Sequence, residues 1–598
     1  MSARSPEAAM IVLDSRMVVD RSSRTGENRE TAGDRSSGAD GRVNMQYETQ
    51  FTKPLRSFRS IVELMTENST AESATASLAA RLRRRVRSFE PMYLAFLGLL
   101  AIPSYVFDSL AVLEVFEIFY LAFLWPFVAP LLEAVLQRGT DADEAVEPTD
   151  WIDMGHWSEY AVWLLSIPLT FLNPFVLAQD FRQWLGTLLA LARHRGSVPE
   201  AGDADRQVSY RLPFDGAWTV VNGSHSRDYS HSWFPVNQRY AYDFVITDAE
   251  GSTRPDSAAA TVENYYCYDE PILAPADGVV IDTFDGDLEP SRAGGFSHPL
   301  KRDIRGNYVV IQHAPDEYSC LAHLVPGSVT VEPGERVERG QRVGRCGHSG
   351  NSSEPHLHFQ LQDQPNFALA TSRPIAFDDV AFEWPGAEAP ITEPYLGASG
   401  DDGGARNVAL PGDLADGTYR ARAFLTAGQR VAHVGHDADA DRADSDAPDD
   451  RRREIATGAK ANRRRPASVA LGRIGFGACV GGVAAVVASI FVSPLTVAGL
   501  LGVAAAAAPL ARIADRSIHD ADGRLERRLE AVGTAAGIAA VGAAVAWYGL
   551  TDPAVGFGPR TLGVSAFLLG FIVDAAAGEY DRRQLRESFR GVVSPATA

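Results

Sequence analysis

The 598-residue chain has only four cysteines and three lysines. The cysteines form no Cys-x-x-Cys pair, which excludes a disulfide scaffold and a cysteine-ligated zinc knuckle. The formal net charge is −20, from 76 acidic against 56 basic residues. Because phosphate contacts need clustered Lys and Arg, we expect no nucleic-acid partner. The acidic, lysine-poor composition is typical of a salt-loving organism, although a GC-rich genome also favours Arg over Lys.

The N-terminal region, residues 1–80, has no sustained apolar period and is rich in Ser, Arg, Glu and Gly. This composition predicts disorder. No apolar segment follows the first basic residues, so no cleavable signal peptide is expected. Met45 is a candidate for the true start.

Two hydrophobic blocks flank the middle of the chain. The first, residues 90–195, has apolar runs at 91–107, 111–136 and 160–179, and predicts two or three transmembrane helices or, alternatively, a buried helical hairpin. The second, residues 467–598, is rich in Gly and Ala and predicts four transmembrane helices. The chain is therefore expected to be a multi-pass membrane protein in contact with the lipid bilayer.

Arginine clusters lie beside the predicted C-terminal spans. They occur at 463–465, between 512 and 528, and from 582 to 590, where all can face the cytoplasm together. The cluster at 81–87 also favours a cytoplasmic N-terminus, but three N-terminal spans would then place the middle of the chain outside. The sequence leaves the side of the middle segment open.

The middle segment, about 205–400, predicts an all-β antiparallel sheet or sandwich, so the fold class is mixed. Short β-branched or aromatic runs predict strands at 240–246, 278–281, 307–313, 341–344 and 357–361. Residues 401–466 are expected to hold a small β extension to about Val434, followed by an acidic linker. On the last predicted strand His356 and His358 are two residues apart, so both imidazoles lie on one face and can reach one centre.

The surroundings of this His-x-His pair resemble the signature of the lysostaphin/LytM-type zinc metallopeptidases. Four more elements resemble that family and occur in the family's order. They are Ala274-Pro-Ala-Asp-Gly-Val-Val280, Gly306-Asn-Tyr-Val-Val-Ile-Gln-His313, Cys320-Leu-Ala-His-Leu324, where Cys320 replaces the usual Tyr, and the Gly- and Val-spaced run 331–341. The resemblance covers roughly residues 205–375.

The resemblance implies a membrane-bound zinc metalloendopeptidase with the family's duplicated hybrid motif fold. It would hydrolyse peptide bonds through a zinc-activated water. Asp243 matches the aspartate ligand of the family's His-x-x-x-Asp motif, and His358 matches the second His of His-x-His. His323 and His356 match the catalytic histidines. A peptide or protein substrate is implied, and the family's frequent cell-wall substrates make a cell-envelope substrate one possibility.

One position departs from the family. Four residues before Asp243 the family has His, whereas this chain has Arg239, which cannot ligate zinc. His231, 12 residues before Asp243, is the favoured replacement for the third Zn²⁺ ligand; His225 and the absence of a third ligand are the alternatives. The alternative function is a zinc-free, inactive binding or regulatory module of the same fold.

The remaining polar residues of the segment have structural interpretations. His313 is expected to be packed or hydrogen bonded in its strand, and His348 to lie at the surface in a Gly- and Ser-rich turn. Arg239 is expected to be a solvated strand residue, with binding of a substrate carboxylate as the alternative. Cys320 and Cys346 are expected to be small core residues.

Overall fold

The computed structural model of the protein describes residues 90–105, 107–125, 172–201, 208–230, 232–249, 251–255, 257–384, 417–435, 465–513, 521–550 and 558–590, with the single residues 128, 132 and 414. The region 1–80, most of the apolar run 160–179 and the acidic linker lie outside these residues. So does His231, the favoured third zinc ligand.

The middle of the chain folds around an eleven-stranded sheet, in the order β12-β11-β13-β1-β2-β9-β6-β5-β4-β7 with β10 beside β9, and β3 pairs separately with β8. Every strand pair in the described residues is antiparallel. The strands are β1 Ala217–Asn222, β2 Tyr242–Val245, β3 Pro271–Leu273, β4 Gly278–Phe284, β5 Asn307–Ala314, β6 Glu317–Leu324, β7 Arg336–Val337, β8 Arg342–Arg345, β9 Leu357–Gln362, β10 Ser372–Arg373, β11 Phe377–Glu383, β12 Thr418–Ala423 and β13 Arg430–His433.

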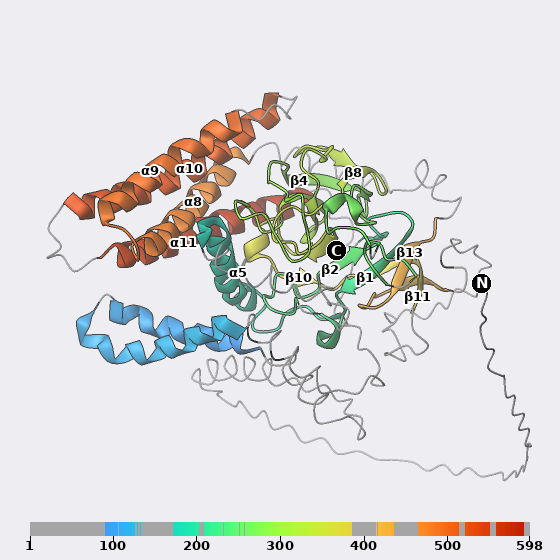
Figure 1. Ribbon diagram of the computed structural model, residues 1–598, viewed down its shortest axis with the longest axis horizontal. Coiled ribbons are helices and arrows are strands. Elements are labelled where there is room, and N and C mark those ends of the chain that lie inside the picture. The colour runs from blue at the N-terminus through green and yellow to red at the C-terminus, as the bar shows by residue number, and fades with distance from the viewer. Residues whose placement is uncertain are drawn as a thin grey trace, which may run out of the picture. The chain divides into compact units, whose positions relative to one another are not determined.

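The five predicted strands are confirmed as β2, β4, β5, β8 and β9, of which β2, β4 and β8 are labelled in Figure 1. Beyond these strands β11 pairs with both β12 and β13, and β13 joins the sheet through β1. The strands nearest the chain centre are buried along their whole length: β5, β6 and β9 have no exposed residue. Such strands must be covered on both faces.

Two different sets of side chains cover the two faces of the sheet. One face contributes Val309 and Ile311 to the main hydrophobic core of the β domain. The opposite face contributes Val310 and Tyr318 to a second cluster, completed by Val176 and Leu585 from two helices. Helices from both ends of the chain therefore pack on the sheet.

The first of these helices is α5, Pro174–Arg193. It begins at Pro174 because Asn173 caps it: the Asn173 side chain accepts hydrogen bonds from the backbone N–H groups of Phe175 and Val176. The Asn173 amide also donates to the carbonyl of Lys301, and that of Gln179 donates to the carbonyl of Arg302. The C-terminal end of the apolar run 160–179 thus belongs to a helix that is tied to the β domain.

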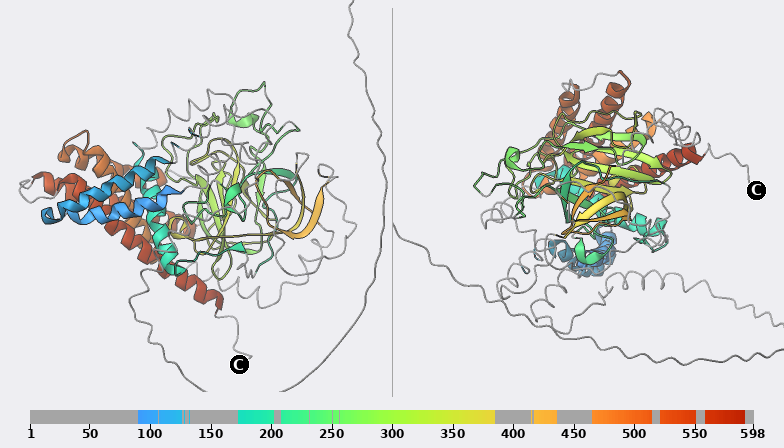
Figure 2. Two further views of the ribbon diagram at one scale, coloured as in Figure 1. Left: turned by 90° about the horizontal axis from the view of Figure 1, so that it is seen from below. Right: turned by 90° about the vertical axis from the view of Figure 1, so that its right-hand side faces the viewer.

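The remaining helices include four long C-terminal ones that lie side by side (Figures 1 and 2). They are α8 Pro466–Ala488, α9 Pro494–Ile513, α10 Ala521–Leu550 and α11 Pro559–Arg590. The others are η1 Pro91–Tyr105, η2 Asp108–Leu124, η4 Arg227–Tyr229, η5 Val262–Asn264 and η6 Phe367–Leu369. Among the described residues, α8, α10 and α11 are long and apolar enough to span a membrane, while α9 and η1 contain shorter apolar stretches.

Glycine lets these C-terminal helices pack closely, as their composition predicts. A Cβ atom at Gly475 of α8 would lie 2.6 Å from the carbonyl oxygen of Gly570 in α11, and one at Gly570 would lie 2.5 Å from the carbonyl oxygen of Gly475. No side chain larger than hydrogen fits this contact without a shift of the helices.

Candidate active site

The register of three neighbouring strands brings the predicted site residues together. Asp243 of β2 lies opposite His358 of β9, and Asn222 of β1 lies opposite Asp243. On the other side of β9, Ala322 of β6 pairs with His358, so His323 at the next position is close by. The rings of His323 and His356 are 4.6 Å apart, centroid to centroid, and those of His323 and His358 are 5.7 Å apart. The structure therefore places four of the five predicted site residues in one cluster.

Asp243 and His358 make the most direct contact in this cluster. His358 Nδ1 lies 2.9 Å from Asp243 Oδ1, and its Nε2 lies 3.1 Å from Gln360 Oε1. The Gln360 amide nitrogen donates to Asn237 O and Gln362 Oε1, which leaves its oxygen as an acceptor. Both ring nitrogens of His358 thus face acceptors and both donate, which describes an imidazolium.

The electrostatics agree with a charged His358. Burial lowers the pKa of His358, but the hydrogen bond and the charge of Asp243 outweigh it, so this pKa ends above the usual 6.5. The raised pKa of His358 favours a charge-assisted hydrogen bond from its Nδ1 to Asp243 Oδ1. Gln360 holds the opposite edge of the ring, and sequence reasoning missed it. Its position two residues after His358, on the same face of β9, is the signal that predicts it.

The pKa values of His323 and His356 are shifted in the opposite direction from that of His358. His356 Nδ1 donates to Glu354 O over 2.8 Å, and His323 Nδ1 donates to Ser349 O over 2.8 Å. Burial lowers the pKa of both histidines, that of His323 well below 6.5. In the neutral form each therefore carries its lone pair on Nε2. The Nε2 atom of His356 lies 3.7 Å from Asp243 Oδ1.

The backbone at His323 is held in an uncommon conformation. Its φ of 63° lies in the left-handed region that residues other than glycine rarely adopt. Strain of this kind persists where the surrounding structure enforces it and gathers at functional sites. His323 is the next-to-last residue of β6, and its ring lies beside that of His356.

Asn222 fixes the other oxygen of Asp243. Its amide nitrogen lies 3.0 Å from Asp243 Oδ2 and also 3.0 Å from Ser232 Oγ. Sequence reasoning missed Asn222, since no local pattern marks it. Ser232 directly follows His231 in the chain. The Asn222 side chain therefore links Asp243 to the residue next to His231.

His225, the alternative third ligand, follows β1 and lies near Phe424 in the connection between β12 and β13. Its ring lies 5.6 Å from that of Phe424, and burial lowers its pKa. Among the described residues no group of three His, Cys, Asp or Glu side chains is arranged to hold a metal ion. Two of the three protein ligands that a catalytic zinc needs are present among the described residues, because Asp243 and His358 lie side by side. A third ligand must come from another residue.

Arg239 corrects the expectation of a solvated strand residue. It lies in the turn before β2 and is 3% exposed. Its guanidinium lies 4.8 Å from the ring centre of Trp233, and its Nη2 donates to the hydroxyl of Tyr93 over 3.2 Å. Arg239 is therefore packed against the N-terminal helix η1.

The predictions for His313 and His348 have different outcomes. His313 is buried and its ring nitrogens lie 2.9 Å from Asp277 O and 2.8 Å from Ser319 Oγ, which confirms a packed strand residue. The surface position predicted for His348 is wrong: its exposed fraction is 0%. Its Nε2 lies 2.9 Å from Phe296 O, since the segment around Phe296 covers this turn. Cys320 and Cys346 are buried free thiols, as predicted.

With this geometry in place, the class of the β domain is clear. Residues 262–368 match Peptidase family M23, so the chain contains a peptidase domain of the lysostaphin/LytM type. The match includes His323, His356 and His358, while Asp243 precedes it.

Two named endopeptidases and a solved peptidase structure are similar to parts of this chain. The peptidoglycan DD-endopeptidase ShyA of Vibrio cholerae is 34% identical over 181 residues, which cover 29% of this chain and 32% of the relative. The DD-carboxypeptidase/endopeptidase Mpg of Neisseria gonorrhoeae is 34% identical over 118 residues, which cover 19% of this chain and 23% of the relative. A solved zinc-containing peptidase from Vibrio cholerae is 22% identical, with 28% of this chain and 39% of that chain covered and a TM-score of 0.18. The chain thus spans about a third of the length of the first of these relatives.

Proposed function

We propose that this chain is a membrane-bound zinc metalloendopeptidase. In this proposal the domain at 205–400 is held between two blocks of membrane helices and cleaves peptide bonds in a peptide or protein substrate. The observation that carries the proposal is the convergence of Asp243 and His358, 2.9 Å apart, beside the rings of His323 and His356. A histidine and a carboxylate placed in this way are ligands that zinc prefers, and the metal binds them in their deprotonated forms.

Zinc would be held by Asp243, His358 and His231. When bound, it supplies Lewis-acid polarisation of the substrate carbonyl and of the attacking water. His231 is preferred to His225 because Ser232, its neighbour, shares the Asn222 amide with Asp243. The Gln360 oxygen would keep its hydrogen bond to His358 Nε2 and so orient the ring, as acceptors behind metal-bound histidines do.

His323 and His356 would handle the protons of the reaction. Each has its Nδ1 proton fixed on a backbone carbonyl, which leaves Nε2 as the basic atom. Their lowered pKa values keep both neutral at pH 7, so either can take a proton from a water molecule that attacks the peptide carbonyl. The other, once protonated, can donate to the developing oxyanion or to the leaving amine.

A zinc-free binding or regulatory module is the second candidate. It is favoured by Arg239, which is turned to Tyr93, and by the absence of a three-donor group among the described residues. In that function the Asp243–His358 ion pair would be a structural link between β2 and β9.

Zinc analysis of the full-length protein in detergent and high salt separates the two functions. One zinc per chain is expected in the wild type and in His225→Ala, and loss of the metal is expected in His231→Ala and Asp243→Ala. The wild type should cleave a peptide substrate and His356→Ala should not, although it keeps its zinc. A wild-type protein that takes up no zinc after incubation with the metal would establish the binding module instead.

A further inference from the structure

The ends of two membrane-type helices are tied to the peptidase domain by ion pairs. Near the start of α8, Arg473 Nη2 lies 3.8 Å from Asp282 Oδ1 of β4. Near the end of α11, Arg582 and Arg586 lie 3.2 Å and 3.0 Å from the two carboxylate oxygens of Asp316, in the turn between β5 and β6. The first turns of α8 and the last turns of α11 therefore face the same domain.

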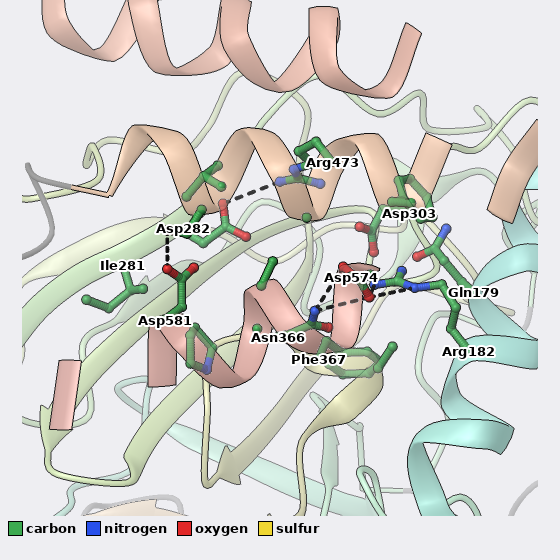
Figure 3. A pocket seen from close by; sticks show the side chains of 18 of the residues that line it. Gln179, Arg182, Ile281, Asp282, Asp303, Asn366, Phe367, Arg473, Asp574 and Asp581 are labelled. Atoms are coloured by element: carbon green, nitrogen blue, oxygen red, sulfur yellow. Dashed lines mark hydrogen bonds and ion pairs between the residues drawn. The ribbon is translucent and has the colours of Figure 1, made fainter. Parts of the chain in front are cut away.

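A pocket lined by both helices, by α5 and by the domain marks this junction (Figure 3). Asp574 of α11 accepts from Arg182 Nη2 of α5 over 2.5 Å and from the Asn366 amide of the domain over 3.3 Å. Arg182 and Asp574 are 8% and 4% exposed. Charges inside a helical bundle are tolerated where they pair and face its interior, as Arg182 and Asp574 do here.

The directions of the helices follow from their glycine contacts. Gly477 and Gly481 of α8 lie against Thr534 and Val541 of α10, so these two helices run parallel. By contrast, α11 runs antiparallel to α8, because Gly475 meets Gly570 while Gly482 meets Gly563. The starts of α8 and α10 and the end of α11 consequently lie at one end of the bundle, the end that holds the peptidase domain.

Basic residues are concentrated in the sequence segments that adjoin this end. The segments 451–465, 512–528 and 582–590 carry sixteen Lys and Arg residues. The connections at the opposite end, 489–493 and 549–560, carry one, Arg560. Loops rich in Lys and Arg are retained on the cytoplasmic side of a membrane, and counts within about 15–20 residues of the spans decide the orientation.

The N-terminal block agrees with this orientation. Glu90 lies 3.6 Å from Arg227 of the domain, and the five arginines between 81 and 87 directly precede it. Asn173, at the other end of the block, contacts Lys301. Because residues 90 and 173 both contact the domain, the chain between them crosses the membrane an even number of times or not at all. This removes the conflict between the arginine clusters that three N-terminal spans would create.

We propose that the peptidase domain lies on the cytoplasmic face of the membrane. Its substrate class, which rests on the proposed function, is then a peptide or protein segment presented on the cytoplasmic side. Peptide cross-links of an external cell wall are excluded as substrates, because a membrane separates them from His323 and His356.

Cysteine labelling of the full-length protein in intact cells tests this orientation. All four native cysteines are buried, so the wild type provides the unlabelled background. Leu300→Cys probes the domain, where Leu300 is 69% exposed, and Phe491→Cys probes the turn between α8 and α9, where Phe491 is 72% exposed. We expect a membrane-impermeant maleimide to label Phe491→Cys at least tenfold more than Leu300→Cys in intact cells, and both equally after permeabilisation.

Labelling of Leu300→Cys in intact cells, with Phe491→Cys protected, would overturn the proposal. If either variant is not labelled even after permeabilisation, a green fluorescent protein fused after Ala598 provides a second test. A fluorescent fusion supports a cytoplasmic location for the end of the bundle that holds the peptidase domain. A fusion that reaches the membrane but is not fluorescent contradicts it. The pattern should be unchanged in an Asp243→Ala background, because orientation does not depend on zinc. An inactive protein with this pattern would refute the enzyme alone, and an active protein with the reversed pattern would refute the orientation alone.

Discussion

Arg239 and Tyr93 are joined by a hydrogen bond of 3.2 Å between Nη2 and the phenol oxygen, across 146 residues of sequence. The guanidinium also lies over the ring of Trp233. The side chain of Arg239 thus connects the N-terminal helix η1 to the turn before β2, which gives it a structural role.

Replacement of Arg239 should therefore affect stability and leave metal binding intact. For Arg239→Ala we expect the free energy of unfolding to fall by about 1–3 kcal/mol, because a buried charged hydrogen bond and a stacking contact are lost. Urea unfolding of the full chain in detergent measures this, with Arg292→Ala, at an exposed position, as the control. Loss of zinc from Arg239→Ala would show instead that the arginine acts on the metal centre.

Local patterns account for what the sequence predicted correctly. The strands β2, β5 and β9 follow from β-branched and aromatic runs, and the convergence of His356 and His358 follows from the two-residue period of a strand. Asp243 came from the family motif. Their mutual contact required only the register of neighbouring strands, which the antiparallel sheet supplies.

Contacts between distant segments account for what it missed. Arg239 looked solvated because its partner Tyr93 is far away in sequence. His348 looked exposed because its Gly- and Ser-rich neighbours are typical of surface turns, whereas the segment around Phe296 covers it. Asn222 has no sequence signal at all. The proposed orientation of the domain rests on contacts between the helices and the β domain, which no local sequence pattern predicts.

Gln360 gives a test of how His358 is positioned. Gln360→Leu removes the acceptor at His358 Nε2, and we expect a 10–100-fold weaker zinc affinity, the usual effect of losing such a partner. Gln360→Glu keeps an oxygen at this place and should retain most of the affinity. Competition with a chelator measures both. Equal affinities for the Leu variant and the wild type would remove Gln360 from the metal centre.

The burial of His348 predicts that the stability of the protein depends on pH. Burial, with a smaller contribution from His356, lowers the pKa of His348 to about 4, against 6.5 for the unfolded chain. Because the unfolded state binds the extra proton first, the contribution of neutral His348 is complete above pH 6.5 and is lost as the pH falls towards 4. The full loss is about 3 kcal/mol.

The variant His348→Asn isolates this contribution. At pH 7 it should be less stable than the wild type, because the hydrogen bonds to Ser352 and Phe296 are weakened. Between pH 6.5 and 4.5 the difference should shrink, since only the wild type must keep a histidine neutral there. Unfolding free energies at four pH values measure this. Parallel curves for the two proteins would mean that His348 does not carry the pH dependence.

The glycine contact between α8 and α11 gives a prediction with opposite signs for two similar substitutions. Gly475→Ala places a methyl group 2.6 Å from the carbonyl oxygen of Gly570, so the helices must separate, and we expect a loss of about 1–3 kcal/mol. Gly499→Ala in α9 meets no atom within 4 Å, so the better helix propensity of alanine should leave stability equal or higher by up to about 1 kcal/mol. Thermal unfolding of the two variants in detergent distinguishes packing from propensity. If both alanines stabilise the protein, the two helices do not meet through their glycines, and the antiparallel arrangement that places the end of α11 beside the peptidase domain loses its support.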